Sequence, residues 1–237
     1  MGGEAPAGPA MTPEEIASRV KGVRARIAAA CERAGRNPAG VRLIAVTKGQ
    51  PAEAVAAALA AGVAEFGENR VQEGLAKIAA VAELAGAEAA RARWHLIGHL
   101  QSNKARAAAG AFAILHGIDS VRLLELLDRV APAPVRVLLE VNVAGEATKF
   151  GVAPGEVGFV LEQARRLERV QVEGLMTVAP RVQDPEEVRP VFRELRGLAE
   201  THGLRELSMG MTDDFEVAIE EGATMVRIGR AVFGERP

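Results

Sequence analysis

Eight short apolar runs, each followed by a helix-forming stretch, most constrain what this chain can fold into. The runs are rich in Val, Ile and Leu and the stretches in Ala, Leu, Arg and Glu, a rhythm typical of repeated βα units and a parallel sheet. We place the strands at 43–47, 64–66, 94–97, 113–115, 136–142, 171–176, 206–208 and 225–228. Eight such strands, with no break in composition between the two halves, predict a single closed (β/α)8 TIM barrel.

The intervening helices are predicted from their composition and from the Pro, Asp or Asn residues that open several of them. They fall at 51–61, 69–85, 102–109, 120–130, 155–168, 185–202 and 213–221. An earlier helix is predicted to begin after Thr12, because Pro13 and two glutamates follow this suitable N-cap residue. Residues 1–10 are almost all Gly, Ala and Pro, so we expect a flexible N-terminal extension ahead of a barrel domain at 11–237.

An open, doubly wound sheet is the other architecture that alternates strands with helices. It typically carries a glycine-rich phosphate turn after its first strand. The corresponding segment here, TKGQPAE, contains neither the G-x-G-x-x-G pattern nor a P-loop. The barrel is therefore the preferred prediction.

The composition excludes several classes of function. With a net charge of −2, the sequence has no excess of positive charge with which to bind nucleic acid or anionic lipid. No apolar run is long enough to span a membrane and the N-terminus lacks the order of a signal peptide, so we expect a cytoplasmic protein. Cys31 is the only cysteine, which excludes disulfides within the chain. His95 and His99 lack an H-E-x-x-H pattern and clustered acids, so no metal site is expected.

Lys48 follows directly on the first buried run, LIAVT, and is one of five lysines in a chain with 24 arginines. The turn Gly49-Gln50-Pro51 then leads into a helix whose backbone amides face the same end of the barrel. Partial desolvation and nearby positive partial charge both favour an uncharged amine, the form that attacks a carbonyl. We therefore interpret Lys48 as a carbonyl-binding amine, in preference to a surface lysine.

Reacting groups in such barrels stand on the loops that follow the C-terminal ends of the strands. The predicted strand exits are Lys48, Gly67-Glu68-Asn69, Gly98-His99, His116 with Asp119, Asn142, Thr177, Ser208-Met209-Gly210, and Arg227 with Gly229. Most are polar or glycine although the strands behind them are apolar. Strands also end in polar residues simply because they end at the surface. Position alone therefore assigns a role only to Lys48.

The loops after the seventh and eighth strands are candidates for an anion site, because these loops often bind phosphate through backbone N–H groups. Ser208 and Gly210 precede a helix here, Gly229 lets the backbone approach closely, and Arg230 adds charge. Arg227 lies inside the last strand, where an inward arginine needs a partner. A ring nitrogen that accepts a hydrogen bond and a structural salt bridge are equally good interpretations from spacing alone.

Taken together, these segments resemble one family, the pyridoxal phosphate homeostasis proteins. The resemblance runs from residue 12 to residue 235 in the order and spacing of the family. It is carried by LIAVTKGQP, FGENRVQE, WHLIGHLQSNK, VLLEVNVAGEATKFG, VEGLMTVAP, LSMGMTDDFEVAIEEGATMVRIG and RAVFGER. A match this long is far more specific than a lone short motif.

The resemblance implies a barrel like the N-terminal domain of alanine racemase, a type III pyridoxal phosphate fold, with pyridoxal 5′-phosphate held as a Schiff base on Lys48. Asn69 would lie beside the cofactor, and Arg227 would face its pyridine nitrogen. The residues implied to hold the phosphate are Ser208, Met209, Gly210, Gly229 and Arg230. Many members carry a threonine or serine where this sequence has Arg230, so that contact is expected to be ionic or through the backbone.

The residues favour a carrier over a racemase. An arginine opposite the ring nitrogen does not donate a full proton, so the ring would be a weak electron sink. Racemases of this type add a second base, a tyrosine, and a β-rich domain; this sequence has no tyrosine and ends just after the eighth strand. We expect a non-catalytic protein that carries and buffers the cofactor in vitamin B6 and amino- and keto-acid homeostasis. A weak racemase is the alternative, and an aldolase without cofactor is a third.

The resemblance to this family and the contrast with the racemases also imply the expected partners and oligomeric state. A carrier of pyridoxal phosphate would make transient contacts with apo-enzymes that use the cofactor. The missing β-rich domain would remove the usual dimer surface of the racemases, so a monomer is expected.

Overall fold

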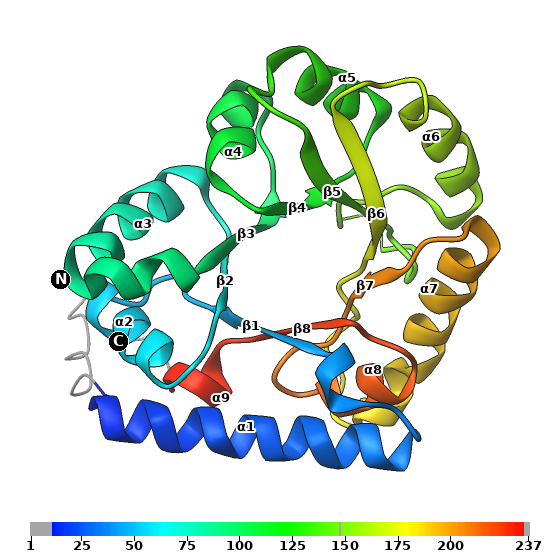
Figure 1. The fold of residues 1–237 in the computed structure, drawn as a ribbon. Coiled ribbons are helices and arrows are strands. Elements are labelled where there is room, and N and C mark those ends of the chain that lie inside the picture. Colours follow the sequence, from blue (N-terminus) through cyan, green and yellow to red (C-terminus); the bar gives the residue numbers. More distant parts are fainter. Residues whose placement is uncertain (1–10, 147, 235–237) are drawn as a thin grey trace, which may run out of the picture.

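The computed structural model describes residues 11–146 and 148–234, and within them eight parallel strands close into one barrel. The strands follow one another around the barrel in chain order, and β8 pairs with β1 to close it (Figure 1). They are β1 (Arg42–Val46), β2 (Glu65–Glu68), β3 (Arg93–His99), β4 (Ile114–Ile118), β5 (Val135–Glu140), β6 (Val170–Met176), β7 (Glu206–Ser208) and β8 (Met225–Ile228). The predicted (β/α)8 barrel is therefore confirmed. The prediction for residues 1–10 lies outside the described residues.

Helices surround the barrel on its outside (Figure 1). In the described ranges the α-helices are α1 (Pro13–Arg33), α2 (Ala52–Ala60), α3 (Val71–Ala85), α4 (Ala105–Ala111), α5 (Val121–Val130), α6 (Val157–Ala164), α7 (Arg189–His202), α8 (Phe215–Glu220) and α9 (Arg230–Phe233). The 3₁₀ helices there are η1 (Pro38–Gly40), η2 (Gly86–Arg91), η3 (Ser102–Lys104), η4 (Pro154–Glu156) and η5 (Pro185–Val188). None of these helices combines the length and the apolar character needed to cross a bilayer.

Helix α1 precedes the first strand and lies along the outside of the barrel beside β1 and β8 (Figure 1). Thr12 caps it as predicted, because its hydroxyl accepts the Glu15 N–H at 3.2 Å while the Glu15 carboxylate accepts the Thr12 N–H at 2.8 Å. The buried face of α1 packs against α2, α8 and α9. Since α9 has only four residues, α1 completes the ring of helices where a longer eighth helix would otherwise lie.

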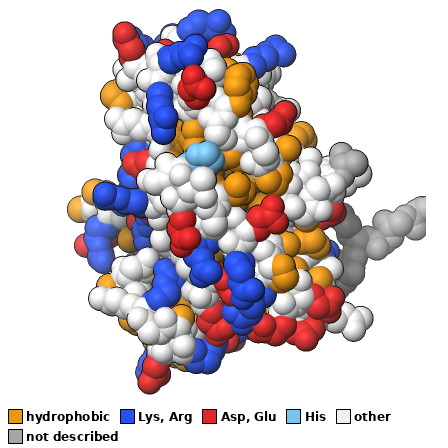
Figure 2. All heavy atoms as spheres, turned by 90° about the vertical axis from the view of Figure 1, so that its right-hand side faces the viewer, with side chains coloured by type: hydrophobic (Ala, Val, Ile, Leu, Met, Phe, Trp, Pro, Cys, Tyr) orange, Lys and Arg blue, Asp and Glu red, His pale blue; other side chains and the backbone are white. Residues whose placement is uncertain are grey.

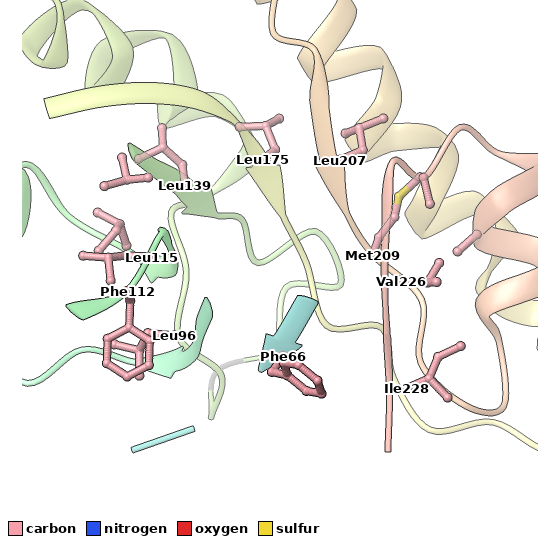
Figure 3. Close-up of a cluster of buried hydrophobic side chains, with 14 of the residues drawn as sticks. Phe66, Leu96, Phe112, Leu115, Leu139, Leu175, Leu207, Met209, Val226 and Ile228 are labelled. Carbon is pink, nitrogen blue, oxygen red and sulfur yellow. The ribbon is translucent and has the colours of Figure 1, made fainter. Parts of the chain in front are cut away.

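Two apolar layers stabilise the fold. The larger lies between strands and helices (Figure 3) and includes Phe66, Leu115, Leu139, Leu175, Met209 and Ile228. The smaller lies inside the barrel and consists of Ile44, Ile114, Leu138, Met176 and Met225. Burying side chains of this size contributes about 1.5–3 kcal/mol each. Polar side chains share the buried interior with them, namely His95, His116, Ser208 and Arg227.

One difference from the predicted strands moves a site candidate. The fourth strand, predicted at 113–115, continues as β4 to Ile118, so the prediction that His116 stands at a strand exit is wrong. His116 lies within the strand and is fully buried. Gly117 does not end the strand because it lets β4 approach β3: a Cβ there would lie 2.6 Å from the Gly98 carbonyl oxygen. The other predicted strands end within two residues of the observed bounds.

Figure 2 shows the face over α6 and α7, where basic and acidic side chains are interspersed. A hollow of about 250 Å³ lies between α6, β6 and the end of α7 and is lined mainly by apolar side chains. Nucleic-acid-binding surfaces carry lysine and arginine clustered on one face. The mixed charge of this face does not fit that pattern.

Candidate functional site

Lys48 stands at the C-terminal end of the barrel, which we call the mouth, two residues after β1 ends. A turn follows it: the Gln50 N–H donates to the Thr47 carbonyl at 2.9 Å, and Gly49 has a φ of +70°, which favours glycine. Ile44 lies in the barrel interior, and continuing its alternation past the end of β1 predicts that Lys48 faces the inner rim of the mouth. Lys48 is half-buried there, at the place where the sequence puts a reactive amine.

A buried ion pair lies directly behind this turn, between the barrel and α3. Lys77 of α3 donates to the Thr47 carbonyl at 2.5 Å and to the Glu68 carboxylate at 2.6 Å. It also lies 3.2 Å from the Glu73 carboxylate, which accepts the Gly49 N–H at 2.7 Å. Both neighbours of the rim lysine are thereby tied to one ammonium group. We call Thr47, Glu68, Glu73 and Lys77 the lysine clamp.

Glu68 is the buried anion of this clamp. Its side chain has no exposed surface, and burial raises the pKa of its carboxyl although Lys77 and Thr47 both donate hydrogen bonds to it. The sequence placed Glu68 at a strand exit but gave Lys77 no role. The signal that could have found Lys77 is its place on the buried face of α3, between Gly74 and Val81, where an apolar residue is expected.

Arg227 lies inside the barrel below the mouth, on the same face of β8 as Met225 of the inner apolar layer. It is buried and donates to the Ser208 carbonyl at 2.7 Å, to the Ser208 hydroxyl at 2.6 Å and to the Thr177 carbonyl at 2.8 Å. Burial lowers the pKa of Arg227 to about 10, with Asp214 and Glu140 acting against that shift, so the guanidinium is charged at neutral pH. These contacts take three of its five N–H bonds and none is to a carboxylate of the described residues, which favours a ligand over a structural salt bridge.

Asn69 follows β2 at the mouth and is partly buried. Its Oδ1 atom is buried and has no hydrogen-bond partner within residues 11–146 and 148–234. Such an atom costs stability unless a ligand or water satisfies it. The backbone of Asn69 is also closely approached, because a Cβ on Gly98 would lie 2.4 Å from its carbonyl oxygen. This environment fits a polar group bound beside Asn69.

The loops after β7 and β8 are joined by an ion pair between Arg230 and Asp213. Gly210 has a φ of +89°, and a Cβ there would lie 2.5 Å from the Ala218 Cβ, so glycine is required on both counts. Gly229 caps the short α9. The backbone at Gly210 and Gly229 therefore remains a candidate for anion binding, with the charge of Arg230 partly balanced.

Two of the residues expected to hold phosphate point elsewhere. The Ser208 hydroxyl lies inside the barrel against Arg227 and against His116 at 2.9 Å. The Met209 side chain is fully buried in the layer between strands and helices (Figure 3), and its N–H donates to the Met225 carbonyl at 3.2 Å. Neither side chain lines the mouth.

The β3 to β5 side of the mouth carries a second group of polar residues. His99 lies 3.1 Å from the Asp119 carboxylate and stacks on Phe150 with ring centroids 4.1 Å apart. Glu140 ends β5, and burial raises the pKa of its carboxyl. The part of the chain that the structure describes contains no cluster of three or more metal-ligating side chains. This side of the mouth is therefore polar.

Comparison with known proteins places this chain in a family. The sequence pattern described as alanine racemase, N-terminal domain, matches residues 20–237. A pyridoxal phosphate homeostasis protein of Pseudomonas aeruginosa is 43% identical over 226 residues, which cover 93% of this chain and 96% of that protein. The chain belongs to the pyridoxal phosphate homeostasis protein family. The predicted resemblance is thus confirmed, and this relative is named for homeostasis, not for an enzymatic reaction.

Solved structures support the assignment to the pyridoxal phosphate homeostasis proteins. PipY of Synechococcus elongatus PCC7942, in the structure with PLP bound, is 38% identical with a TM-score of 0.78, covering 92% of this chain and 100% of that chain. Alanine racemase of Clostridium difficile 630 is 14% identical with a TM-score of 0.70, covering 94% of this chain and 57% of that chain. The second similarity shows the fold alone.

Proposed function

We propose that this chain binds pyridoxal 5′-phosphate reversibly through a Schiff base on Lys48, and that it carries and buffers the cofactor in vitamin B6 and amino- and keto-acid homeostasis. The family and the PLP bound to PipY support this function. The observation that carries it is the placement of Lys48 after β1 and of Arg227 on the neighbouring β8 at the same open end. An amine for an aldehyde thus follows β1, and a charged donor for a ring nitrogen lies on β8, the strand that pairs with it.

The remaining residues at the mouth fit the other parts of the cofactor. We assign Asn69, whose Oδ1 has no hydrogen-bond partner among the described residues, to the ring side of the cofactor. We assign the phosphate to the backbone around Gly210 and Gly229, with Arg230 nearby, in preference to the side chains of Ser208 and Met209. Backbone N–H groups bind phosphate without help from a hydroxyl, which agrees with the replacement of the usual threonine or serine by Arg230.

Bound pyridoxal phosphate supplies an aldehyde and an electron-withdrawing ring. The Lys48 amine supplies the nitrogen of the carbon–nitrogen double bond, and one water leaves. The lysine clamp holds Thr47 and Gly49 in place on either side of that amine. Arg227 would donate a hydrogen bond to the ring nitrogen and keep its own proton, so the bound ring would withdraw electrons only weakly.

These properties suit a carrier whose own chemistry stops at reversible attachment. The sequence has no tyrosine to act as the second base of a racemase. We further propose that the protein is monomeric and cytoplasmic and that it meets apo-enzymes transiently. A concentration series in analytical ultracentrifugation that gives one species with the mass of a single chain supports the monomer, and a dimer would contradict it.

Titration with pyridoxal phosphate tests the proposed binding. We expect a visible absorption band that saturates at one cofactor per chain. Borohydride reduction should bleach the band and leave the cofactor mass on the peptide that contains Lys48. A chain that gives no band, or a label on another residue, would overturn the proposed function.

Exchange of the α-proton of alanine tests whether the loaded protein is a catalyst. In deuterium oxide we expect the exchange rate to stay within about tenfold of that with free cofactor, because one weak sink and one base supply little of the acceleration of a racemase. The control is the same protein after borohydride reduction. An acceleration of about a thousandfold or more would favour the racemase alternative.

A further inference from the structure

A single chain of hydrogen bonds crosses the inside of the barrel from Arg227 to the beginning of β2. Arg227 Nη1 lies 2.6 Å from Ser208 Oγ, which lies 2.9 Å from His116 Nδ1. His116 Nε2 lies 2.9 Å from His95 Nδ1, and His95 Nε2 lies 2.6 Å from the Glu65 carboxylate. The five residues belong to β8, β7, β4, β3 and β2. Closure of the barrel, and not nearness in sequence, brings them together.

The two end residues of this hydrogen-bond chain fix the direction in which every hydrogen bond along it is donated. A guanidinium only donates hydrogen bonds and a carboxylate only accepts them. With both imidazoles neutral, Ser208 accepts from Arg227 and donates to His116. His116 then donates from Nε2 to His95, and His95 donates from Nε2 to Glu65. Every link is satisfied when each ring carries its single hydrogen on Nε2.

The surroundings keep both histidines of the hydrogen-bond chain neutral. Burial lowers the pKa of His95, and it lowers the pKa of His116 well below its usual range. Burial opposes ionisation of Glu65, but the hydrogen bond from His95 and the nearby arginines outweigh it and lower the pKa of the carboxyl. A neutral pair of rings thus connects a cation to an anion. The other charged groups that face the hydrogen-bond chain are Arg42, Arg93, Arg136, Glu140 and Asp214.

We propose that Glu65, His95, His116 and Ser208 are positioning residues for the cofactor site, which hold Arg227 in the orientation that meets the cofactor ring. This inference rests on the proposed function, in which Arg227 faces the pyridine nitrogen. Polar groups inside a barrel cost stability unless all their hydrogen bonds are made, and a fully satisfied network is rigid. Rigidity at Arg227 keeps its remaining N–H bonds aimed at the mouth.

Lowering the pH should weaken the positioning of Arg227, beginning at the Glu65 end of the hydrogen-bond chain. If His95 gains a proton, its Nδ1 becomes a donor, and His116 must move its hydrogen to Nδ1, pointing at Ser208. The serine hydroxyl then receives two hydrogen bonds and loses the acceptor for its own hydrogen. The orientation of Arg227 is thereby coupled to protonation at the beginning of β2, where Glu65 also borders a hollow of about 420 Å³.

Nitrogen NMR of the ¹⁵N-labelled chain without cofactor tests the hydrogen-bond chain directly. At neutral pH we expect His95 and His116 to be neutral with the hydrogen on Nε2, and to stay neutral when the pH is lowered through the ordinary range of an imidazole. Single His→Gln variants assign the signals. An imidazolium at neutral pH, or a hydrogen on Nδ1 of either ring, would overturn the inference. This readout does not depend on cofactor binding.

The variant Glu65→Gln tests the effect on the site, and Glu173→Gln is its matched control. Glu173 also sits at the N-terminal end of the barrel, paired with Arg136 at 2.5 and 2.7 Å, but it lies outside the hydrogen-bond chain. We expect Glu65→Gln to weaken pyridoxal phosphate binding about threefold to tenfold and to shift the pH profile of the bound absorption band. The control should stay within about twofold with an unchanged profile.

Equal cofactor affinities and equal pH profiles in the two folded variants would contradict the inference. If Glu65→Gln does not fold, Ser208→Ala replaces it, with Ser208→Thr as the conservative variant expected to restore the profile. Failure of the wild-type chain to bind the cofactor on Lys48 would instead overturn the proposed function and leave the NMR result standing. The two failures are therefore distinguishable.

Discussion

Replacing Lys48 by alanine is expected to abolish both the visible absorption band and the borohydride-stable attachment of the cofactor, and to weaken binding about a hundredfold or more, because the covalent bond is lost and only non-covalent contacts remain. The fold should be retained. Lys48 is half-buried at the rim and contributes nothing to either apolar layer, so the thermal midpoint should change by no more than about 2 °C.

The matched control is Lys149→Ala. Lys149 lies in the loop after β5 and is close enough to the mouth for its charge to act on Glu140. Its removal takes one amine from the same end of the barrel and should leave the band intact. Trapping of the cofactor on Lys149 or Lys77 in the Lys48→Ala protein, or collapse of that variant, would contradict the assigned position of the reactive amine.

The fold could be predicted because its signals are local. Each strand is an apolar run and each helix has its own start, so the β and α segments follow from the sequence one at a time. The bounds of β4 could not be found in this way. Gly117 permits a close approach to Gly98 of the neighbouring strand, and this contact exists only when the barrel is closed.

The site residues likewise divide into those that local sequence signals identify and those whose contacts exist only in the folded barrel. Lys48 and Arg227 were identified because a polar residue directly after, or within, a buried strand is conspicuous in the sequence. Ser208 was also identified, but its contact with His116 was not, because the two residues are 92 positions apart in the sequence and meet only in the closed barrel. Lys77 was missed because a lysine on a helix is usually solvated. The spacing of Lys77 from Gly74 and Val81 along α3 was the signal that could have shown that it faces inward.

Replacing Lys77 by methionine is expected to lower the free energy of unfolding by about 3–5 kcal/mol. Methionine has a similar length, so little volume is lost, but Glu68 is left buried without its cation. The side chains of Lys77 and Glu68 are 8% and 0% exposed, respectively, so water cannot replace the lost partner. Denaturant unfolding of the cofactor-free protein measures the change.

The loss should depend on pH in a defined direction. Burial already raises the pKa of Glu68 in the native protein, and loss of the ammonium raises it further. A carboxyl whose pKa is higher in the folded than in the unfolded state binds its proton more readily when folded, so stability falls as pH rises above the unfolded value. The deficit of Lys77→Met should therefore be smaller near pH 4 and grow toward neutral pH.

The double variant Lys77→Met/Glu68→Gln separates the buried charge from the lost packing. It should recover about 2 kcal/mol of the deficit and lose most of its pH dependence, because neither side chain of this pair can then ionise. Cofactor binding should recover less than stability does. The Thr47 carbonyl and the Glu73 carboxylate still lack the ammonium that held them beside Lys48, so the amine is less well positioned for attack. Full recovery of affinity in the double variant would show that the lysine clamp acts on folding alone.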